Sequence, residues 1–103
     1  MAATGILISG RAKAGKRDAL YSLYLEHVVP HLEASDNVET VVWSADRDDD
    51  DAYHLLEIFK AAGDQQSVLG SDWFRAYMAL AASLAAEPPV VHHLETRWTK
   101  GIG

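Results

Sequence analysis

The spacing of apolar positions switches repeatedly between the period of a strand and the period of a helix. The short, β-branched segment Thr4–Ala12 predicts a first strand. Over Lys16–Ala34 the apolar positions recur at helical spacing and form one stripe, made of Leu20, Leu23, Tyr24, His27, Val28 and Leu32. Pro30 lacks the backbone N–H that a continuing helix needs, so we expect a kink or an end near Val29.

Two further strands follow, joined by an acidic turn. The alternating segments Asn37–Asp46 and Ala52–Lys60 predict an antiparallel pair. Four consecutive aspartates, Asp48–Asp51, lie between them, and their mutual repulsion favours a solvated turn. A calcium loop is not expected there, because the alternating oxygen donors and the distal glutamate of such a loop are missing.

A second helical region and a last strand complete the pattern. Gly63 and Gly70 separate a short helix from a longer one, for which Ser71 is the expected N-cap. The apolar face of the longer helix consists of Phe74, Tyr77, Met78, Ala81 and Leu84. Pro88–Pro89 should end this helix, and the segment Val90–Trp98 then predicts the last strand.

This order of elements predicts one α+β domain over residues 1–103. Strand, helix, strand, strand, helix, strand is the βαββαβ order of the ferredoxin-like fold, with a four-stranded antiparallel sheet and both helices on one face. A sheet face without helices should be polar. In the third strand, however, apolar residues point to both faces of the sheet: Tyr53, Leu55 and Phe59 to one, Leu56 and Ile58 to the other. We therefore expect a second copy of the chain to cover the free face.

Composition and charge exclude several classes of function. The net charge is −6 and the nine Lys and Arg residues are scattered, which argues against nucleic acid and anionic membranes as partners. The chain has no cysteine, no secretory signal and no run near the ~20 apolar residues of a membrane span, so a cytoplasmic location is expected. His27 and His31 have a metal-binding spacing, but Pro30 disrupts it and no third ligand is placed, so no metal site is expected.

Four loose motifs together resemble one known family. They are "AGK" (Ala14–Lys16), "YHLLEIF" (Tyr53–Phe59), "SDWF" (Ser71–Phe74) and a closing strand with Glu95. The chain in this respect resembles the antibiotic-biosynthesis-monooxygenase-type family of dimeric α/β barrels. The resemblance implies a homodimer whose sheets face each other, with a pocket between sheet and helices in each subunit. Members of the family include cofactor-free monooxygenases of polycyclic phenols, haem-degrading enzymes and a sugar-phosphate isomerase.

The chain departs from the family pattern in two respects. Val68 and Leu69 stand where members often carry a histidine. The haem-degrading branch has an asparagine on the first strand, which Thr4–Lys13 lacks, and a tryptophan and a histidine where this chain has Val68 and Met78. Haem degradation is therefore not expected.

A cofactor-free oxygenase needs a base, a hydrogen-bond donor and a dry pocket, but no cofactor. Tyr77 and His92 are the candidate catalytic residues. Five residues are candidates for lining an apolar pocket around a hydrophobic phenolic or quinone-like molecule: His54, Trp73, Phe74, Met78 and Trp98. The alternative for the aromatic residues is ordinary core packing.

Strand alternation divides the chemical-looking stretch "PPVVHHLETRW" into two faces. His92 and Trp98 share the more apolar face, which we expect to point towards the helices. His93, Glu95 and Arg97 share the other face, which we expect at the seam between subunits. Glu57 lies in the apolar stripe of the third strand, where it must be paired, be hydrogen-bonded or have a raised pKa. An ion pair with Arg97 or another strand residue, within the subunit or across the dimer interface, is favoured over a role as general base.

Two functions remain open from the sequence. One is a cofactor-independent monooxygenase, or an isomerase of the same barrel, that acts on a hydrophobic cyclic small molecule. The other is a non-catalytic dimeric barrel that binds a small molecule or serves in stress or regulation. The two are distinguished by whether Trp73, Tyr77, His54 and His92 border one common cavity.

Overall fold

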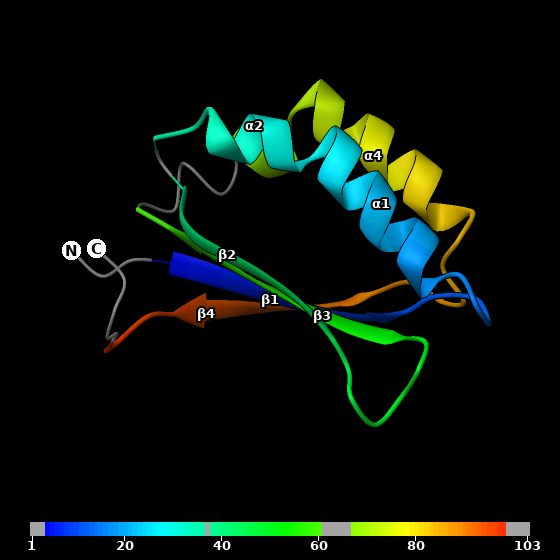
Figure 1. The fold of residues 1–103 in the computed structure, drawn as a ribbon. Coiled ribbons are helices and arrows are strands. Elements are labelled where there is room, and N and C mark those ends of the chain that lie inside the picture. The colour runs from blue at the N-terminus through cyan, green and yellow to red at the C-terminus, as the bar shows by residue number, and fades with distance from the viewer. Residues whose placement is uncertain (1–3, 37, 61–66, 99–103) are drawn as a thin grey trace.

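Within the described residues, helices lie on one face of a four-stranded antiparallel sheet (Figure 1). The computed structural model describes residues 4–36, 38–60 and 67–98. Its elements are β1 (Thr4–Arg11), α1 (Arg17–His27), α2 (Val29–Glu33), β2 (Val38–Ala45), β3 (Ala52–Phe59), α4 (Asp72–Ala82) and β4 (Val90–Glu95). The strand order is β2-β3-β1-β4. The ferredoxin-like arrangement predicted from the order of elements is confirmed.

The first helical segment breaks where Pro30 predicted, and the N-terminus of the later long helix differs from its prediction only in its capping. The first helical segment breaks at Val28, and Pro30 stands in the first turn of α2, where its missing N–H costs no helical bond. The break expected near Val29 is therefore confirmed, and Pro30 lies in the first turn of a second helix. Ser71 is the N-cap residue of α4, but its Oγ donates to the Val68 carbonyl at 2.6 Å and caps no backbone N–H.

The second half of the chain holds shorter elements than expected. α4 ends at Ala82, several residues before Pro88–Pro89, and β4 ends at Glu95 rather than Trp98. The short helix predicted between Gly63 and Gly70 falls partly on residues 61–66, which lie outside the described residues, and its described part, Ser67, Val68 and Leu69, is helical.

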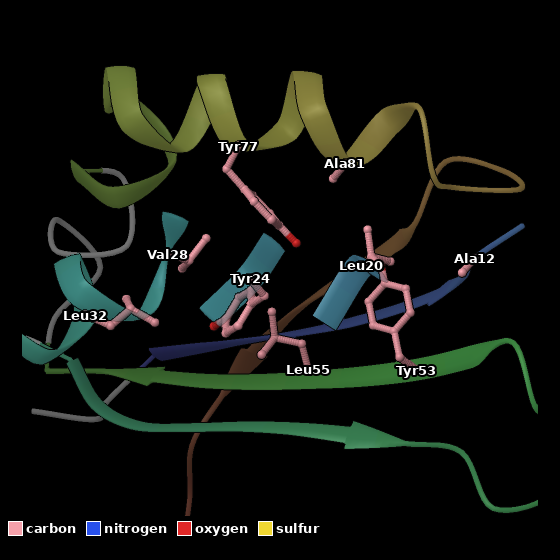
Figure 2. Close-up of a cluster of buried hydrophobic side chains, with 9 residues drawn as sticks. All are labelled: Ala12, Leu20, Tyr24, Val28, Leu32, Tyr53, Leu55, Tyr77 and Ala81. Atoms are coloured by element: carbon pink, nitrogen blue, oxygen red, sulfur yellow. The ribbon is translucent and has the colours of Figure 1, made fainter. Parts of the chain in front are cut away.

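The core lies between the helices and the inner face of the sheet. On this face Ile6 pairs with Glu57, and Ile8 with Leu55, across β1 and β3. One cluster of buried side chains joins α1, α2 and α4 to the sheet (Figure 2): Ala12, Leu20, Tyr24, Val28, Leu32, Tyr53, Leu55, Tyr77 and Ala81. Burial of these apolar side chains is the main contribution to folding free energy.

Gly10 makes room for an aromatic stack on the inner face. A Cβ at Gly10 would lie only 2.6 Å from the Tyr53 hydroxyl, so the tyrosine crosses β1 where β1 has no side chain. Trp43 of β2 stacks on the other side of Tyr53, with ring centroids 5.4 Å apart and planes 1° from parallel. The glycine thereby allows one aromatic layer to extend over three strands.

The outer face of the sheet is apolar over much of its area and carries no helix in the part of the chain described (Figure 1). Leu7 and Leu56 pair on this face, and Val42 of β2 lies beside Leu56. Val42 is 46% exposed and Val90 of β4 is 56% exposed. Both faces of the sheet therefore carry apolar side chains, as the sequence predicted.

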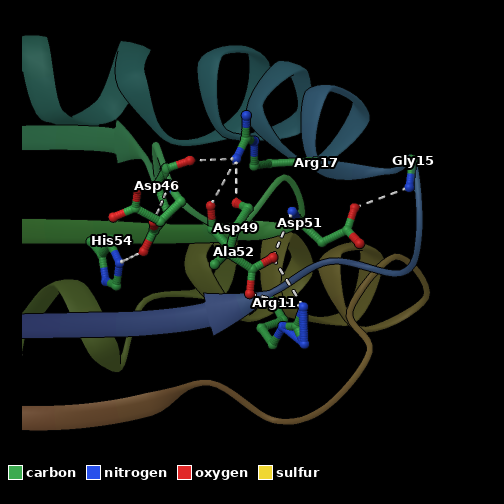
Figure 3. Close-up of polar contacts among 9 residues, drawn as sticks. Arg11, Gly15, Arg17, Asp46, Asp49, Asp51, Ala52 and His54 are labelled. Carbon is green, nitrogen blue, oxygen red and sulfur yellow. Dashed lines mark hydrogen bonds and ion pairs between the residues drawn. The ribbon is translucent and has the colours of Figure 1, made fainter.

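Arg17 clamps the acidic turn between β2 and β3 (Figure 3). Its Nη1 donates to the carbonyl oxygens of Asp46, Asp49 and Ala52 at 3.1, 2.9 and 3.2 Å. Arg11 forms an ion pair with the Asp49 carboxylate at 2.9 Å on the exposed side of the same turn. The run of aspartates is a turn, as predicted, and two arginines stabilise it.

We expect Arg17→Met to lower the free energy of unfolding by about 2 kcal/mol or more, because three carbonyls lose a charged donor. Arg11→Met is the matched control and should cost less than about 1 kcal/mol, because its ion pair is exposed. Urea unfolding followed by circular dichroism measures both. If both variants lose the same free energy of unfolding, the three hydrogen bonds of Arg17 do not stabilise the turn more than the exposed ion pair of Arg11 does.

Candidate functional site

A cleft of about 720 Å³ lies between the inner face of the sheet and the helices. Ile6 and Ile8 of β1 form its floor, and Phe74, Tyr77 and Met78 of α4 line the helix side. The wall is mostly apolar, and its ionisable or hydroxyl-bearing residues are Tyr24, Tyr53, Tyr77, Glu87 and His93. Such a cleft suits a hydrophobic ligand with few polar groups.

The predicted pocket residues divide into two groups. Phe74, Tyr77 and Met78 line the cleft, whereas His54, Trp73, His92 and Trp98 do not. The cavity shared by Trp73, Tyr77, His54 and His92 therefore does not form.

Each misplaced residue has a physical reason for its position. His54 pairs with Ser9 across the strands and so lies on the outer face. Trp73 stacks on His31 of α2, with ring centroids 4.2 Å apart and planes 4° from parallel. Trp98 lies beyond the end of β4 and is 79% exposed.

The two adjacent histidines have the opposite orientation from the predicted one. In the β1–β4 register Ile6 pairs with His93 and Leu7 with His92. Because Ile6 is buried under the helices, His93 faces the cleft and His92 faces outward. The prediction that the His92 set points towards the helices is wrong, and so is the prediction that His93 belongs to the set turned away from them.

The charged end of β4 forms a local ion pair. Arg97 donates to the Glu95 carboxylate at 3.0 Å, and both side chains are largely exposed. The ion pair expected between Glu57 and Arg97 is therefore not formed in this structure. A role of Glu95 and Arg97 in dimerisation stays a prediction.

Two tyrosine hydroxyls lie close to the cleft in surroundings that keep them protonated. Tyr24 and Tyr77 contact each other edge to face, with ring centroids 5.9 Å apart, and Tyr77 reaches from α4 towards the sheet (Figure 2). Burial is the main cause that raises the pKa of both hydroxyls above the ordinary value. Both are therefore hydrogen-bond donors at neutral pH, and the buried Tyr24 hydroxyl has no hydrogen-bond partner among the residues described.

Glu57 is the buried carboxyl beneath these tyrosines. It is 2% exposed, and burial raises its pKa to about 7. Its charge contributes to the raised pKa of Tyr24 and Tyr77, so the carboxyl lies within electrostatic range of both hydroxyls. The structure records no hydrogen bond or ion pair for this carboxyl within residues 4–36, 38–60 and 67–98.

A smaller groove of about 390 Å³ lies on the β2 side of α1. Tyr21 and Trp43 line it, with ring centroids 4.7 Å apart. Tyr24 lines this groove as well as the larger cleft, so it separates the two spaces. The sequence placed Tyr24 in the buried stripe of the helix but gave no signal that it borders two cavities.

Within residues 4–36, 38–60 and 67–98 there is neither a group of metal ligands nor a helix that could span a membrane. Among the residues that the structure describes, no three His, Cys, Asp or Glu side chains are grouped to hold a metal ion. None of the described helices is long and apolar enough to cross a bilayer.

Solved structures with the same fold cover nearly the whole chain. A protein named "putative Antibiotic biosynthesis monooxygenase" from Chloroflexus aurantiacus has a TM-score of 0.82 and 23% identity, over 98% of this chain and 99% of that one. Proteins with the same description from Caulobacter crescentus and Nitrosomonas europaea have TM-scores of 0.87 and 0.85, with 15% and 14% identity. They cover 94% and 96% of this chain, and 92% and 94% of their own.

The protein therefore has the α+β fold of these antibiotic-biosynthesis-monooxygenase-like proteins. The predicted resemblance is confirmed at the level of the fold. No family model matches the sequence, and no curated protein matches it.

The buried Glu57 should make stability depend on pH. The unfolded chain releases this proton near the ordinary pKa of 4.5, whereas the folded chain holds it up to about pH 7. Between these values the folded state binds more protons, so the free energy of unfolding falls as pH rises, by roughly 3 kcal/mol in all.

Glu57→Gln should remove this part of the pH dependence, measured as urea unfolding at a series of pH values. Glu95→Gln, at an exposed position, is the control and should leave the dependence in place. If the free energy of unfolding of Glu57→Gln still falls with pH as in the unchanged protein, Glu57 is not the group that holds this proton.

Proposed function

We propose that the protein is a cofactor-independent monooxygenase, or an isomerase of the same fold, that acts on a hydrophobic cyclic phenolic or quinone-like molecule. The observation that carries the proposal is the apolar cleft with the protonated Tyr77 hydroxyl and the His93 imidazole on its wall. The fold shared with proteins described as monooxygenases supports the same class of chemistry.

The proposed reaction begins with removal of a proton from the bound substrate. The His93 imidazole takes the proton, and the Tyr77 hydroxyl donates a hydrogen bond to the oxygen where negative charge develops. The electron-rich anion then reacts with dioxygen itself. A substrate CH₂ becomes C=O and the second oxygen atom leaves as water, so no external reductant is needed.

Tyr77 is assigned as donor rather than base because its pKa is raised. A tyrosine in apolar surroundings keeps its proton, and a neutral hydroxyl stabilises a developing oxyanion without placing a second negative charge beside it. The apolar wall excludes water, which strengthens this hydrogen bond.

A non-catalytic binding protein is the second candidate. It is favoured by the failure of Trp73, His54 and His92 to join Tyr77 at one cavity. In this case the cleft holds the same class of hydrophobic cyclic molecule but does not transform it.

We also infer that the working form is a homodimer in which the outer faces of two sheets meet. The apolar outer face has no cover within the described chain, and exposed Val42 and Val90 belong to it. Burial of such a face against a second copy would remove a large apolar area from water.

Oxygen uptake tests the catalytic proposal. With an anthrone-type phenol, Tyr77→Phe and His93→Ala should each lower uptake about tenfold or more, because a donor or the base is lost. His92→Ala is the matched control and should keep most of the activity, because His92 faces outward.

Equal losses in the His92 and His93 variants would contradict the assignment of the base. Quenching of tryptophan fluorescence by the same phenol measures binding separately. Binding without any oxygen uptake in the unchanged protein would favour the non-catalytic candidate.

A second test concerns the dimer. Val42→Lys should yield a monomer at micromolar concentration, because a charge would enter the apolar interface. Leu80→Lys is the control, since Leu80 is equally exposed, at 46%, but lies on α4. Size-exclusion chromatography with light scattering gives the masses, and an unchanged protein that is itself a monomer would overturn the inference.

A further inference from the structure

One row of side chains on the inner face of the sheet leads from the buried carboxyl of Glu57 to the cleft. Glu57 of β3 pairs with Ile6 of β1, and Ile6 pairs with His93 of β4. Ile6 and His93 line the cleft, and Glu57 is the next residue of the row behind this floor. Because neighbouring strands lie about 4.8 Å apart, Glu57 is two strand spacings, or about 10 Å, from His93. The carboxyl is thus close enough to act on a ligand through its charge.

No cation offsets a negative charge on Glu57 within residues 4–36, 38–60 and 67–98. The side chain is 2% exposed, and the ion pairs of this part of the chain involve other residues. A carboxylate that leaves water without a partner is costly, so burial favours the neutral form. Burial raises the pKa of Glu57 to about 7, so the charge of this group changes close to neutral pH.

Two buried tyrosines face Glu57 from the helices. Tyr24 of α1 and Tyr77 of α4 point into the space between helices and sheet (Figure 2). Burial is the main cause that raises the pKa of both hydroxyls, and the charge of Glu57 adds to it. On β3 itself, burial also raises the pKa of Tyr53. The side chains that β1, β2 and α2 contribute nearby are apolar: Ile6, Val41, Val29 and Leu32. All these groups are uncharged at neutral pH.

β4 carries the groups that titrate at the far end of the row. His93 is exposed and lies on the wall of the cleft. Glu95 has the same parity and forms an ion pair with Arg97 at 3.0 Å, with both side chains largely exposed. Water and salt screen an exposed ion pair, so its effect on Glu57 is small. His93 is therefore the group of β4 whose charge has to be controlled when the charge of Glu57 is tested.

We propose that Glu57 selects the ligands of the cleft by their charge. The cleft takes hydrophobic molecules that are neutral when they bind, and it accepts an anion only while the carboxyl behind its floor keeps its proton. The inference rests on the proposed function only in that the cleft is the ligand site. It narrows the substrate class to molecules whose polar groups are uncharged hydroxyls or ketones, and it disfavours carboxylates and phosphate esters.

The size of the effect follows from Coulomb's law. At an effective dielectric constant of roughly 20, two like charges about 10 Å apart shift an equilibrium about tenfold. An anion in the cleft should therefore lose about tenfold in affinity as Glu57 ionises. A neutral ligand of the same shape has no charge for Glu57 to repel, so its affinity should not change.

Two flat probes of similar shape test the inference by binding alone. 2-Methoxynaphthalene is neutral and naphthalene-2-sulfonate is anionic over the whole range from about pH 5.5 to 8.5, and the fluorescence of each probe reports its binding to the full chain. Because an imidazole titrates in the same range, both probes are measured in His93→Asn. In this variant the affinity for the sulfonate should fall about tenfold as the pH rises, and the affinity for 2-methoxynaphthalene should stay within about twofold.

Glu57→Gln, added to His93→Asn, should make the affinity for the sulfonate independent of pH within about twofold. Glu26→Gln is the matched control, because Glu26 is an exposed carboxylate on α1, and in the same background it should keep the tenfold fall.

A sulfonate affinity that does not change with pH in His93→Asn alone would overturn the inference, even if the Glu57→Gln chain does not fold. So would an undiminished fall after Glu57→Gln. If neither probe binds, the cleft is not a ligand site, and the proposed function fails with the inference. If both probes bind as expected but the unchanged protein shows no oxygen uptake, the inference holds and only the catalytic proposal fails.

Discussion

The packing of α1 on the inner face of the sheet is the contact on which the rest of the structure depends. Leu20, Tyr24 and Val28 are each at most 2% exposed and seat the helix over β1 and β3. α4 packs against α1, with Tyr77 edge to face on Tyr24. Because α4 packs against α1, it does not lie directly on β1 and β4. The space between α4 and these two strands is the cleft. The position of α1 on the sheet thus determines both the core and the cleft.

Hydrophobic periodicity was sufficient to predict the fold. Alternation in the strands and one apolar stripe in the first helix specify which residues are buried, and the order of elements then leaves few topologies. The ends of elements were predicted less well, because they depend on tertiary contacts. Pro30 was expected to kink or end a helix near Val29, and the helix does break at Val28, but the new helix that begins at Val29 was not expected. α4 stops at Ala82 although no proline or glycine follows for several residues.

The site was predicted less completely, because it depends on register. Alternation separated His92 from His93 correctly, but only the pairing of Ile6 with His93 decides which of them faces the helices. The apolar neighbours of His92 in sequence did not indicate which side of β4 faces the helices, because β4 is exposed on both faces. The hydrogen bonds of His54 to Ser9 and to Asp46 join residues 45 and 8 positions apart, and no local motif records them.

β4 gives the cleft an adaptable wall. It contributes Val91 and His93 to the cleft, but none of its six residues is buried, and β1 is its one partner among the described strands. Substitutions on such an edge strand cost the fold little free energy while they change the shape and charge that a ligand meets. Proteins with this architecture can therefore evolve new ligand preferences through the last strand while the core beneath α1 stays constant.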